Sequence, residues 1–300
     1  MADSCNFWVI VGPTASGKSD LAMALARSVS GEILSVDSMQ VYRQMDIGTA
    51  KPSPAERGAV RHHLIDLVDA SESFTVAGFV EAADAVIADA ARRGVPLVAT
   101  GGTPLYYKAL FEGLFEGPGA DAAIRQRLNL LDGEELHRRL AEVDPPAAGR
   151  IHLNDTKRLV RALEVYELTG KPITSLQTEW GAGRARHAAR WIGLQWDRDA
   201  LNRRINARVK SMMAAGWLEE TRLLLQSHGS LSPTAAEATG YRDLIDHIGG
   251  KTSLEEAVEQ IKIATRQLAR RQMKWFRRFP NVKWIAGDRP VQELMQSVLE

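Results

Sequence analysis

Residues 7–31 read FWVIVGPTASGKSDLAMALARSVSG, and three patterns follow one another along them. The apolar run at 7–11 is typical of a buried strand, and apolar residues recur at helical spacing from Leu21 to Val29. Between the two, residues 12–19 fit the pattern G-x-x-x-x-G-K-[ST] in full. A glycine-rich loop between a strand and a helix points backbone N–H groups at phosphate oxygens, so the segment predicts a phosphate-binding loop.

This loop supplies the predicted diphosphate ligands. Lys18 adds a full positive charge, and the hydroxyl of Ser19 can coordinate a Mg²⁺ ion that bridges phosphate oxygens. The motif is typical of ATP-binding proteins, but it indicates a diphosphate or triphosphate without identifying a nucleotide. The diphosphate-binding residues predicted here are Gly12, Pro13, Thr14, Ala15, Ser16, Gly17, Lys18 and Ser19.

The sequence around the loop predicts an α/β fold. Buried strands are expected at 33–36 and 96–100, with a long helix at 76–93 between them. Alternating strands and helices imply right-handed crossovers and a parallel sheet. We therefore expect a P-loop NTPase-like core.

A second region interrupts this pattern. Residues 118–187 have helical periodicity and no convincing strand, and a strand-like run returns at 191–194. We expect a catalytic core of residues 1–117 and 188–300, with an all-helical insertion at 118–187.

Polar residues that follow the strands predict a cleft. Asp37 comes just after the strand at 33–36, and Thr103 comes just after the strand at 96–100. The carboxyl ends of parallel strands share one edge of a sheet, so both residues should lie near the phosphate-binding loop. P-loop NTPases usually hold their metal with an acid at a nearby strand end, and residues 100–103 contain none. Asp37 is therefore either the base for a nucleophile or a turn residue.

Composition narrows the class of protein. The 300 residues are 45% hydrophobic and 25% charged, which is ordinary for a globular protein, and no apolar run approaches the roughly 20 residues of a membrane helix. The single cysteine, Cys5, excludes an internal disulfide framework and a multi-cysteine metal site. With no signal-peptide pattern at the N-terminus, we expect a cytoplasmic protein.

The net charge of +1 conceals a gradient. Residues 1–117 have a balance of −5, residues 118–187 of +1 and residues 188–300 of +5. Basic residues recur every four positions from Lys262 to Arg278, and no acid lies within 260–280. The gradient indicates either a polyanion-binding side or an ordinary solvated surface.

The residues alone leave two other functions open. One is a P-loop kinase that acts on a nucleoside or small alcohol, with ATP in the loop and Asp37 as base. The other is an RNA-binding module that has kept a phosphate-binding loop without catalysis. Consumption of ATP would favour the first, and tRNA binding that is indifferent to an isoprenoid diphosphate would favour the second.

Further blocks of sequence narrow the choice. The chain resembles the tRNA dimethylallyltransferase (tRNA isopentenyltransferase) family in an ordered set of motifs. These are GPTASGKS at 12–19, SVDSMQVY at 35–42, DIGTAKP at 46–52, HLID at 63–66, GGTPLY at 101–106, ND at 154–155 with 158–165, GYR at 240–242 and TRQLARRQ at 265–272. The phosphate-binding loop alone is shared with many enzymes, whereas the ordered set is specific.

The resemblance implies an enzyme that transfers a dimethylallyl group from its diphosphate to the exocyclic amine of an adenosine. That adenosine lies immediately 3′ of the anticodon in tRNAs that read codons beginning with U. The partners are then dimethylallyl diphosphate and a tRNA anticodon stem-loop, the cofactor is Mg²⁺, and the enzyme is expected to be a monomer of the short bacterial form.

The resemblance also implies roles for single residues. Asp37 is the general base, Thr103 and Lys18 complete the catalytic group, and Arg222 contacts the diphosphate. The residues implied to contact tRNA are Asp37, Ser38, Met39, Gln40, Thr103, Arg125, Arg161, Ala162, Leu163, Glu164, Val165, Gly240, Tyr241 and Arg242.

Overall fold

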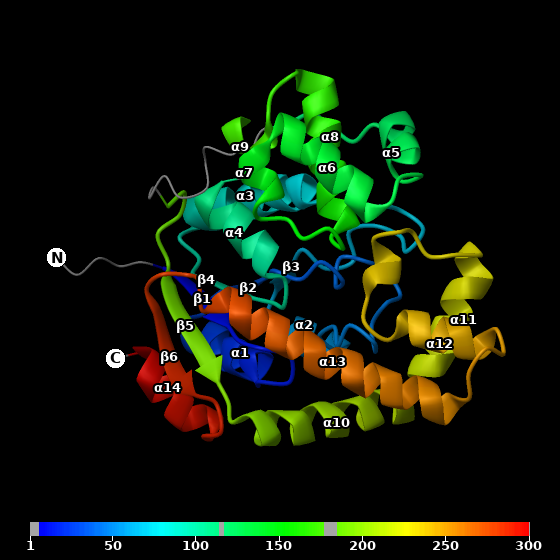
Figure 1. Cartoon of the computed structure of the whole chain (residues 1–300). Helices are drawn as coiled ribbons and strands as arrows, with labels where there is room; N and C mark the ends of the chain where they lie inside the picture. The colour runs from blue at the N-terminus through cyan, green and yellow to red at the C-terminus, as the bar shows by residue number, and fades with distance from the viewer. Residues whose placement is uncertain (1–5, 114–116, 177–184, 300) are drawn as a thin grey trace. The chain divides into compact units, whose positions relative to one another are not determined.

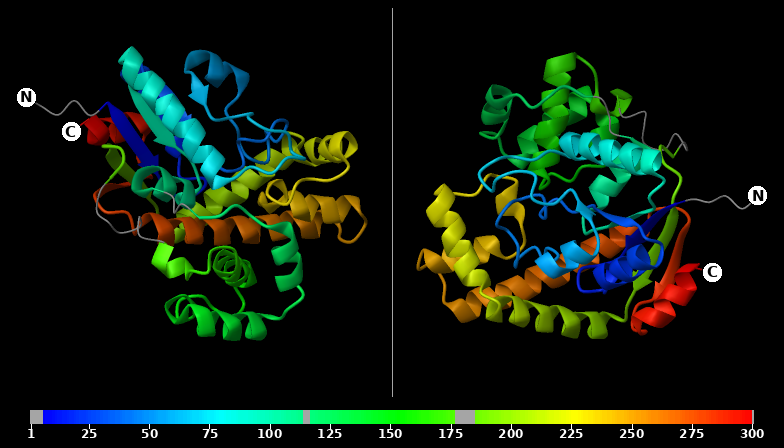
Figure 2. Two further views of the ribbon diagram at one scale, coloured as in Figure 1. Left: turned by 90° about the horizontal axis from the view of Figure 1, so that it is seen from above. Right: turned by 180° about the vertical axis from the view of Figure 1, so that it is seen from behind.

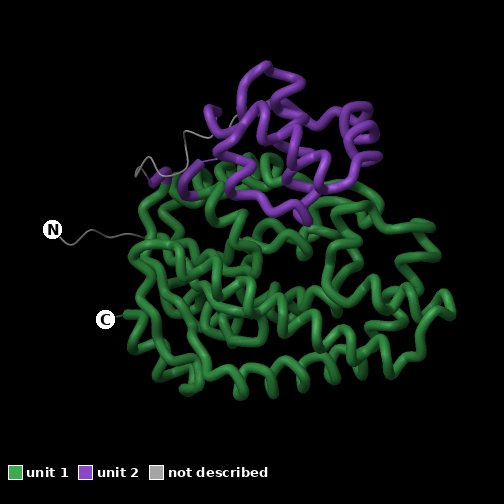
Figure 3. The backbone as a smooth tube through the Cα atoms, in the orientation of Figure 1, with its two compact units in different colours: residues 1–110, 187–300 green, residues 111–186 purple. Residues whose placement is uncertain are grey.

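The computed structural model describes residues 6–113, 117–176 and 185–299. The chain forms two compact units, one of residues 1–110 with 187–300 and one of residues 111–186 (Figure 3). Over the described residues, the first unit contains the sheet, and the second contains helices without a strand. The predicted fold class, an α/β core with an inserted helical segment, is confirmed.

Six parallel strands form the sheet in the order β3-β2-β4-β1-β5-β6 (Figure 1). The strands are β1 (Phe7–Val11), β2 (Glu32–Ser35), β3 (His62–His63), β4 (Leu97–Thr100), β5 (Arg190–Gln195) and β6 (Val282–Ala286). Sequence analysis did not predict β3, because two residues are too short to set up a periodic pattern. The central strand β1 pairs with β4 and β5, so the loop after β1 emerges at the middle of the sheet.

The helices of the first unit include α1 and α3, which the sequence predicts at these places in the chain. They are α1 (Lys18–Ser28), α2 (Pro54–Ala59), α3 (Val76–Arg93), α10 (Arg198–Ala214), α11 (Trp217–His228), α12 (Tyr241–Ile248), α13 (Leu254–Phe276) and α14 (Val291–Leu299), with a 3₁₀ turn η1 (Ala235–Glu237). Helix α4 (Pro104–Glu112) begins in this unit and ends in the other. The side chain of Thr75 caps the start of α3, and Gly94 ends it in the left-handed conformation.

Two apolar clusters organise the first unit. Helices α1 and α14 cover one face of the sheet, where Leu21, Leu25 and Leu294 pack against Ile10 and Ile192. A second cluster lies between the chain segment after β2 and helices α10, α11, α12 and α13. Helices α10 and α13 run side by side along this cluster (Figures 1 and 2).

The buried face of α13 differs in part from its sequence pattern. The apolar spacing indicates Ile261, Ala264, Leu268 and Trp275 as core positions, but the buried residues are Ala257, Ile261, Ala269, Gln272 and Phe276. The pattern missed this face because it carries a buried polar residue, Gln272, and because Leu268 borders a cavity instead of the core.

The second unit is a small helical bundle. Its helices are α5 (Ala122–Leu128), α6 (Gly133–Val143), α7 (Pro145–Ala148), α8 (Thr156–Thr169) and α9 (Ile173–Leu176). Apolar side chains from all five pack into one cluster, in which α8 contributes Leu159, Leu163 and Val165. The unit therefore has a core of its own.

Candidate functional site

A cavity of about 500 Å³ opens in the first unit where β1, β2 and β4 end. Its walls come from segments far apart in the sequence. They are residues 14–20 of the phosphate-binding loop and α1, 37–40 after β2, 48–50, 100–103 after β4, Arg204, Ala207, Arg208, Val209 and Met212 of α10, Trp217, 237–239, and Thr265, Leu268 and Gln272 of α13. The structure thus brings the phosphate-binding loop, Asp37 and Thr103 to one cavity.

The phosphate-binding loop follows a tightly constrained path. Gly17 has a φ of +85°, in the left-handed region that favours glycine. A Cβ atom on Gly12 would lie 2.9 Å from the Ser16 hydroxyl oxygen and 3.2 Å from the carbonyl oxygen of Leu194. Both motif glycines are therefore required by the geometry of the loop itself.

Three side chains from outside the loop hold it in place. The backbone N–H of Thr14 donates to Gln272 Oε1 at 2.8 Å. Arg204 Nε donates to the carbonyl oxygen of Ala15 at 2.8 Å, and Trp196 Nε1 donates to that of Ser16 at 3.0 Å. The Arg204 guanidinium also lies 4.5 Å from the centre of the Trp196 ring, so these two side chains stabilise each other.

Positive charge gathers at this end of the cavity. Burial, together with the charge of Arg208, lowers the pKa of Lys18 to about 8, and Asp37 acts in the opposite direction. Burial also lowers the pKa of Arg208, against the attraction of Asp37 and Asp20. Two cations that repel each other in a poorly solvated cavity would be stabilised by an anionic ligand.

Asp37 is fixed by two backbone donors. Its Oδ1 accepts from the N–H of Met39 at 2.9 Å, and its Oδ2 accepts from the N–H of Gly102 at 3.1 Å. Thr103 lies beside it, with Oγ1 accepting from the N–H of Ser38 at 2.9 Å. A carboxylate held in this way keeps lone pairs for a further donor, which a base needs.

Gln40, also predicted to contact RNA, is committed to its own chain. Its Nε2 donates to the carbonyl oxygens of Thr49 and Ala50 at 3.3 and 3.2 Å, while its Oε1 accepts from the Ser35 hydroxyl at 2.8 Å. Gln40 therefore ties the strand end to the loop at residues 46–51, called here the 46–51 loop.

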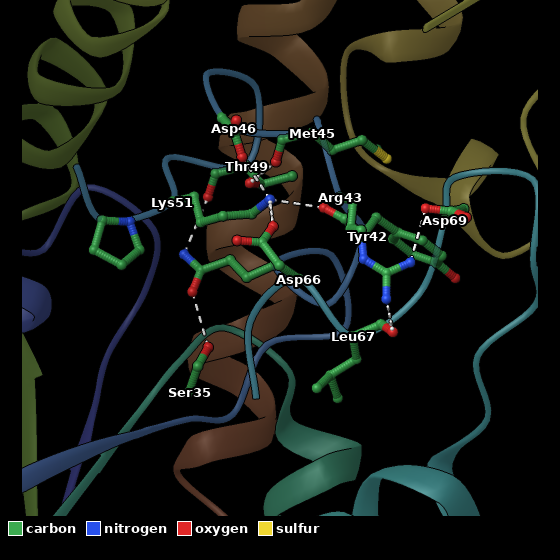
Figure 4. Close-up of polar contacts among 12 residues, drawn as sticks. Ser35, Tyr42, Arg43, Met45, Asp46, Thr49, Lys51, Asp66, Leu67 and Asp69 are labelled. Carbon is green, nitrogen blue, oxygen red and sulfur yellow. Dashed lines mark hydrogen bonds and ion pairs between the residues drawn. The ribbon is translucent and has the colours of Figure 1, made fainter. Parts of the chain in front are cut away.

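Buried charges hold the 46–51 loop from inside. The Lys51 side chain is fully buried, and Nζ donates to the carbonyl oxygen of Tyr42 at 2.7 Å and to the carboxylates of Asp46 and Asp66 at 2.5 and 2.6 Å (Figure 4). Burial raises the pKa of Asp66, but hydrogen bonds from Lys51 and Arg57 outweigh it and leave that pKa below its ordinary value. Three oxygens thus satisfy the three N–H donors of the ammonium group.

A carboxylate from α11 holds the same loop from the other side. Glu220 accepts from the backbone N–H groups of Asp46 at 2.9 Å, Ile47 at 2.6 Å and Gly48 at 3.2 Å. The Tyr241 hydroxyl donates to the same carboxylate at 2.6 Å. A Cβ atom on Gly48 would lie 2.1 Å from Trp217 Nε1, so the loop backbone lies directly against the indole ring.

Some predicted site residues lie elsewhere. Arg222 is not among the residues that line the cavity, and its guanidinium lies 3.4 Å from Glu219 on the surface of α11. Tyr241 is completely buried, and the left-handed Gly240 packs against the Trp217 ring. In the GYR motif only Arg242 is exposed, so burial argues against direct RNA contact by Tyr241.

The predicted RNA-contact residues of the second unit divide in the same way. Ala162, Leu163 and Val165 are buried in its core. Glu164 is 0% exposed and binds Arg125 at 2.7 Å and Arg161 at 2.5 Å. The two arginines remain partly exposed, whereas the burial of residues 162–165 argues against direct contact of those side chains with RNA.

Five residues of this site were missed by sequence analysis: Arg204, Arg208, Gln272, Trp196 and Glu220. A signal existed for two of them, because Arg204 and Arg208 lie four residues apart on one face of a helix. Gln272 lies in the motif TRQLARRQ, but sequence analysis assigned it no role. Nothing in the local sequence indicated that Trp196 or Glu220 would hold the loops around the cavity.

The sequence matches the family described as IPP transferase over residues 40–279. The chain belongs to the IPP transferase family. This family match confirms the resemblance that the sequence motifs indicate. Relatives named tRNA dimethylallyltransferase include one from Geobacter metallireducens, 46% identical over 97% of this chain and 96% of the relative, and one from Anaeromyxobacter sp., 47% identical over 97% of each.

Solved structures of the IPP transferase family have the same fold. The tRNA isopentenylpyrophosphate transferase of Bacillus halodurans matches with a TM-score of 0.72 and 37% identity, covering 98% of this chain and 95% of that one. A eukaryotic dimethylallyltransferase acting on tRNA matches with a TM-score of 0.79 and 28% identity, covering 94% of this chain and 74% of that one. Across the described residues of this IPP transferase, every helix is too short or too polar to span a membrane.

Proposed function

We propose that this IPP transferase moves the dimethylallyl group of dimethylallyl diphosphate onto the exocyclic amine of the adenosine 3′ of the anticodon, in tRNAs that read codons beginning with U. The observation that carries the proposal is one cavity with a phosphate-binding loop and two cations at one end and the Asp37 carboxylate beside them. Such a cavity suits an anionic leaving group and a nucleophile that loses a proton.

In the reaction, the adenine nitrogen forms a bond to the allylic carbon, whose bond to the diphosphate oxygen breaks. Lys18 and Arg208 stabilise the charge that grows on the departing diphosphate, together with N–H groups of the loop. The amine is a poor nucleophile, because its lone pair is delocalised into the ring. Asp37 accepts its proton, an effect worth about 10²- to 10⁴-fold.

We also propose that Mg²⁺ assists this step. The described residues contain no cluster of three or more His, Cys, Asp or Glu side chains that could enclose a metal. Mg²⁺ does not need one, since it binds through few protein oxygens with water and substrate phosphates. The Ser19 hydroxyl lines the cavity beside Lys18 and suits this mode. When bound, the ion would neutralise charge on the leaving diphosphate.

The acceptor tRNA would contact exposed and partly exposed basic residues, in particular Arg125, Arg161, Arg242 and those of α13, together with residues 37–40 and Thr103. An adenosine must leave its stack to enter a cavity, which costs a few kcal/mol and less for an unpaired loop base. The proposed enzyme is a monomer that works in the cytoplasm, as expected from the sequence.

The test is incubation of the purified protein with anticodon stem-loop RNA, Mg²⁺ and dimethylallyl diphosphate, followed by mass analysis of the nucleosides. We expect a prenylated adenosine at the predicted position and release of diphosphate. A parallel reaction with ATP and candidate nucleosides or alcohols tests a kinase instead. Phosphate transfer from ATP without prenylation would overturn the proposal.

A further inference from the structure

The side chain of Gln272 joins the two halves of the reaction site. Its Oε1 accepts from the N–H of Thr14 at 2.8 Å, and its Nε2 donates to the carbonyl oxygen of Gly102 at 2.7 Å. The N–H of that same Gly102 donates to Asp37 Oδ2 at 3.1 Å. A continuous hydrogen-bonded path therefore runs from the phosphate-binding loop through Gln272 and Gly102 to Asp37.

The surroundings of Gln272 leave little freedom for this path. The side chain is only 4% exposed, so an unmatched donor or acceptor would carry the full cost of desolvation. A Cβ atom on Gly102 would lie 2.8 Å from Gln272 Nε2 and 3.1 Å from Asp37 Oδ2. Gly102 thus fits between the two side chains only because it has no side chain of its own.

An amide suits this place because it has one donor and one acceptor at a fixed separation. A carboxylate would accept from Thr14 but would face the Gly102 carbonyl oxygen without a donor. An apolar side chain would leave both backbone groups without partners. The geometry explains why a glutamine lies on the otherwise apolar buried face of α13.

We propose that Gln272 is a positioning residue that fixes the Asp37 carboxylate relative to the phosphate-binding loop. The inference rests on the proposed function and extends it. The base must reach the amine while the diphosphate is held in the loop, and displacements of about 1 Å in such arrangements cost up to 10²-fold in rate. Gln272 is not a catalytic residue, since it acts through Thr14 and Gly102.

The first variant is Q272M, which keeps the length of the side chain and removes both hydrogen bonds. We expect the single-turnover rate at saturating substrates to fall about 10- to 100-fold, with the KM for tRNA within about threefold of wild type. The matched control is Q260M, at an exposed position on the same helix α13, which should keep the wild-type rate. A wild-type rate for Q272M would overturn the proposal.

The second variant, Q272E, remains informative if Q272M folds poorly. A protonated carboxyl has one donor and one acceptor and reproduces the amide, whereas the ionised form does not. The Gly102 carbonyl and nearby Asp37 both favour the protonated form. We therefore expect the rate of Q272E relative to wild type to rise about tenfold as the pH falls from 8 to 6, and not to rise for Q260E.

The ratio to wild type removes other titrations from this measurement. The charged side chains that share the cavity with Gln272 are Lys18, Asp20, Asp37, Arg204, Arg208 and Glu237, and all are present in both proteins. A ratio that stays flat with pH would contradict the proposal. So would a change in thermal stability with pH that fully accounts for the change in rate.

Amide hydrogen exchange separates this inference from the proposed function. In the absence of substrates, Q272M should exchange the Thr14 and Gly102 amides faster than wild type, while Q260M should not. If wild type fails to prenylate RNA but these amides respond, the function is wrong and the hydrogen-bonded path is right. If wild type is active and the amides do not respond, the path is wrong.

Discussion

The two sides of the cavity are held by different kinds of interaction. The phosphate-binding loop is fixed by hydrogen bonds to its backbone from Trp196, Arg204 and Gln272. The 46–51 loop is fixed by buried charges, with Lys51 on one side and Glu220 on the other. On the first side no carboxylate of the described residues lies within salt-bridge distance of Lys18 or Arg208. On the second side Lys51 forms ion pairs with Asp46 and Asp66, and Glu220 accepts hydrogen bonds from backbone N–H groups. The cations that line the cavity, Lys18 and Arg208, are thus distinct from Lys51, the cation that stabilises the 46–51 loop.

The largest expected effect comes from a change at Asp37, on the side of the cavity that binds the ligand. Asp37→Asn keeps shape and hydrogen-bonding capacity but removes the ability to take a proton. The single-turnover rate should fall by about 10² or more, with little change in tRNA affinity. A loss of only a few-fold would mean that Asp37 orients the amine, and rescue by added Mg²⁺ would mean that it binds the metal.

The next largest effect concerns Lys51, the buried lysine that holds the 46–51 loop. Lys51→Met removes the ammonium and leaves Asp46, Asp66 and the Tyr42 carbonyl without their donor. We expect the free energy of unfolding to fall by about 2 kcal/mol, below the full cost of breaking a buried ion pair because both carboxylates are partly exposed. Urea unfolding measures it, and Lys251→Met, at an exposed ion pair, should cost well under half as much.

A smaller effect distinguishes two arginines. Arg208 lines the cavity, while Arg222 lies outside it beside Glu219. Arg208→Ala should weaken binding of inorganic diphosphate by about tenfold, equal to 1.4 kcal/mol, whereas Arg222→Ala should change it by less than about twofold. Calorimetric titration of both variants measures this, and the reverse order would restore Arg222 to the diphosphate site.

The smallest expected effect is the contribution of Asp66 to the dependence of stability on pH. Asp66 has a pKa below its ordinary value of about 3.9, so its contribution to stability is present above that value and is lost as the pH falls through the folded-state pKa. Asp66→Asn lacks this contribution at every pH. We expect the unfolding free energies of variant and wild type to differ at pH 6 and to converge as the pH falls below the folded-state pKa of Asp66. Parallel curves would show that Asp66 does not titrate with folding.

Sequence reasoning reached the parts of this site that lie in continuous motifs. Residues 12–19, Asp37 and Thr103 were placed together because each follows a strand, and parallel strands end at one edge of the sheet. Strands β1, β2, β4 and β5 and helix α3 were found for a similar reason, since periodicity is a local property. Features that depend only on residues close together in the sequence could therefore be predicted.

The remainder depends on contacts between distant segments. Gln272 and Thr14 are 258 residues apart, and no local pattern shows which face of α13 borders the cavity. The same limit applies to Arg222, which the family resemblance places on the diphosphate, whereas Arg208 is the arginine that lines the cavity; a motif does not tell which helix faces the phosphate-binding loop. The family resemblance implies RNA contacts at residues 162–165 and Tyr241, but a motif can equally reflect packing, as the complete burial of Tyr241 indicates.

The fit of Gly48 against Trp217 limits how this enzyme could be redesigned for a larger allylic donor. Any residue with a Cβ atom at position 48 would have to displace the indole, and Ala50 already has a φ of +48° that bulkier residues rarely adopt. Of the three cavity-lining residues in this loop, Thr49 has a side chain and no positive φ, and its Oγ1 donates to the carbonyl oxygen of Met45 at 2.6 Å. Under the proposed function, attempts to widen the donor range should therefore begin at Thr49 and at Met212, which also lines the cavity.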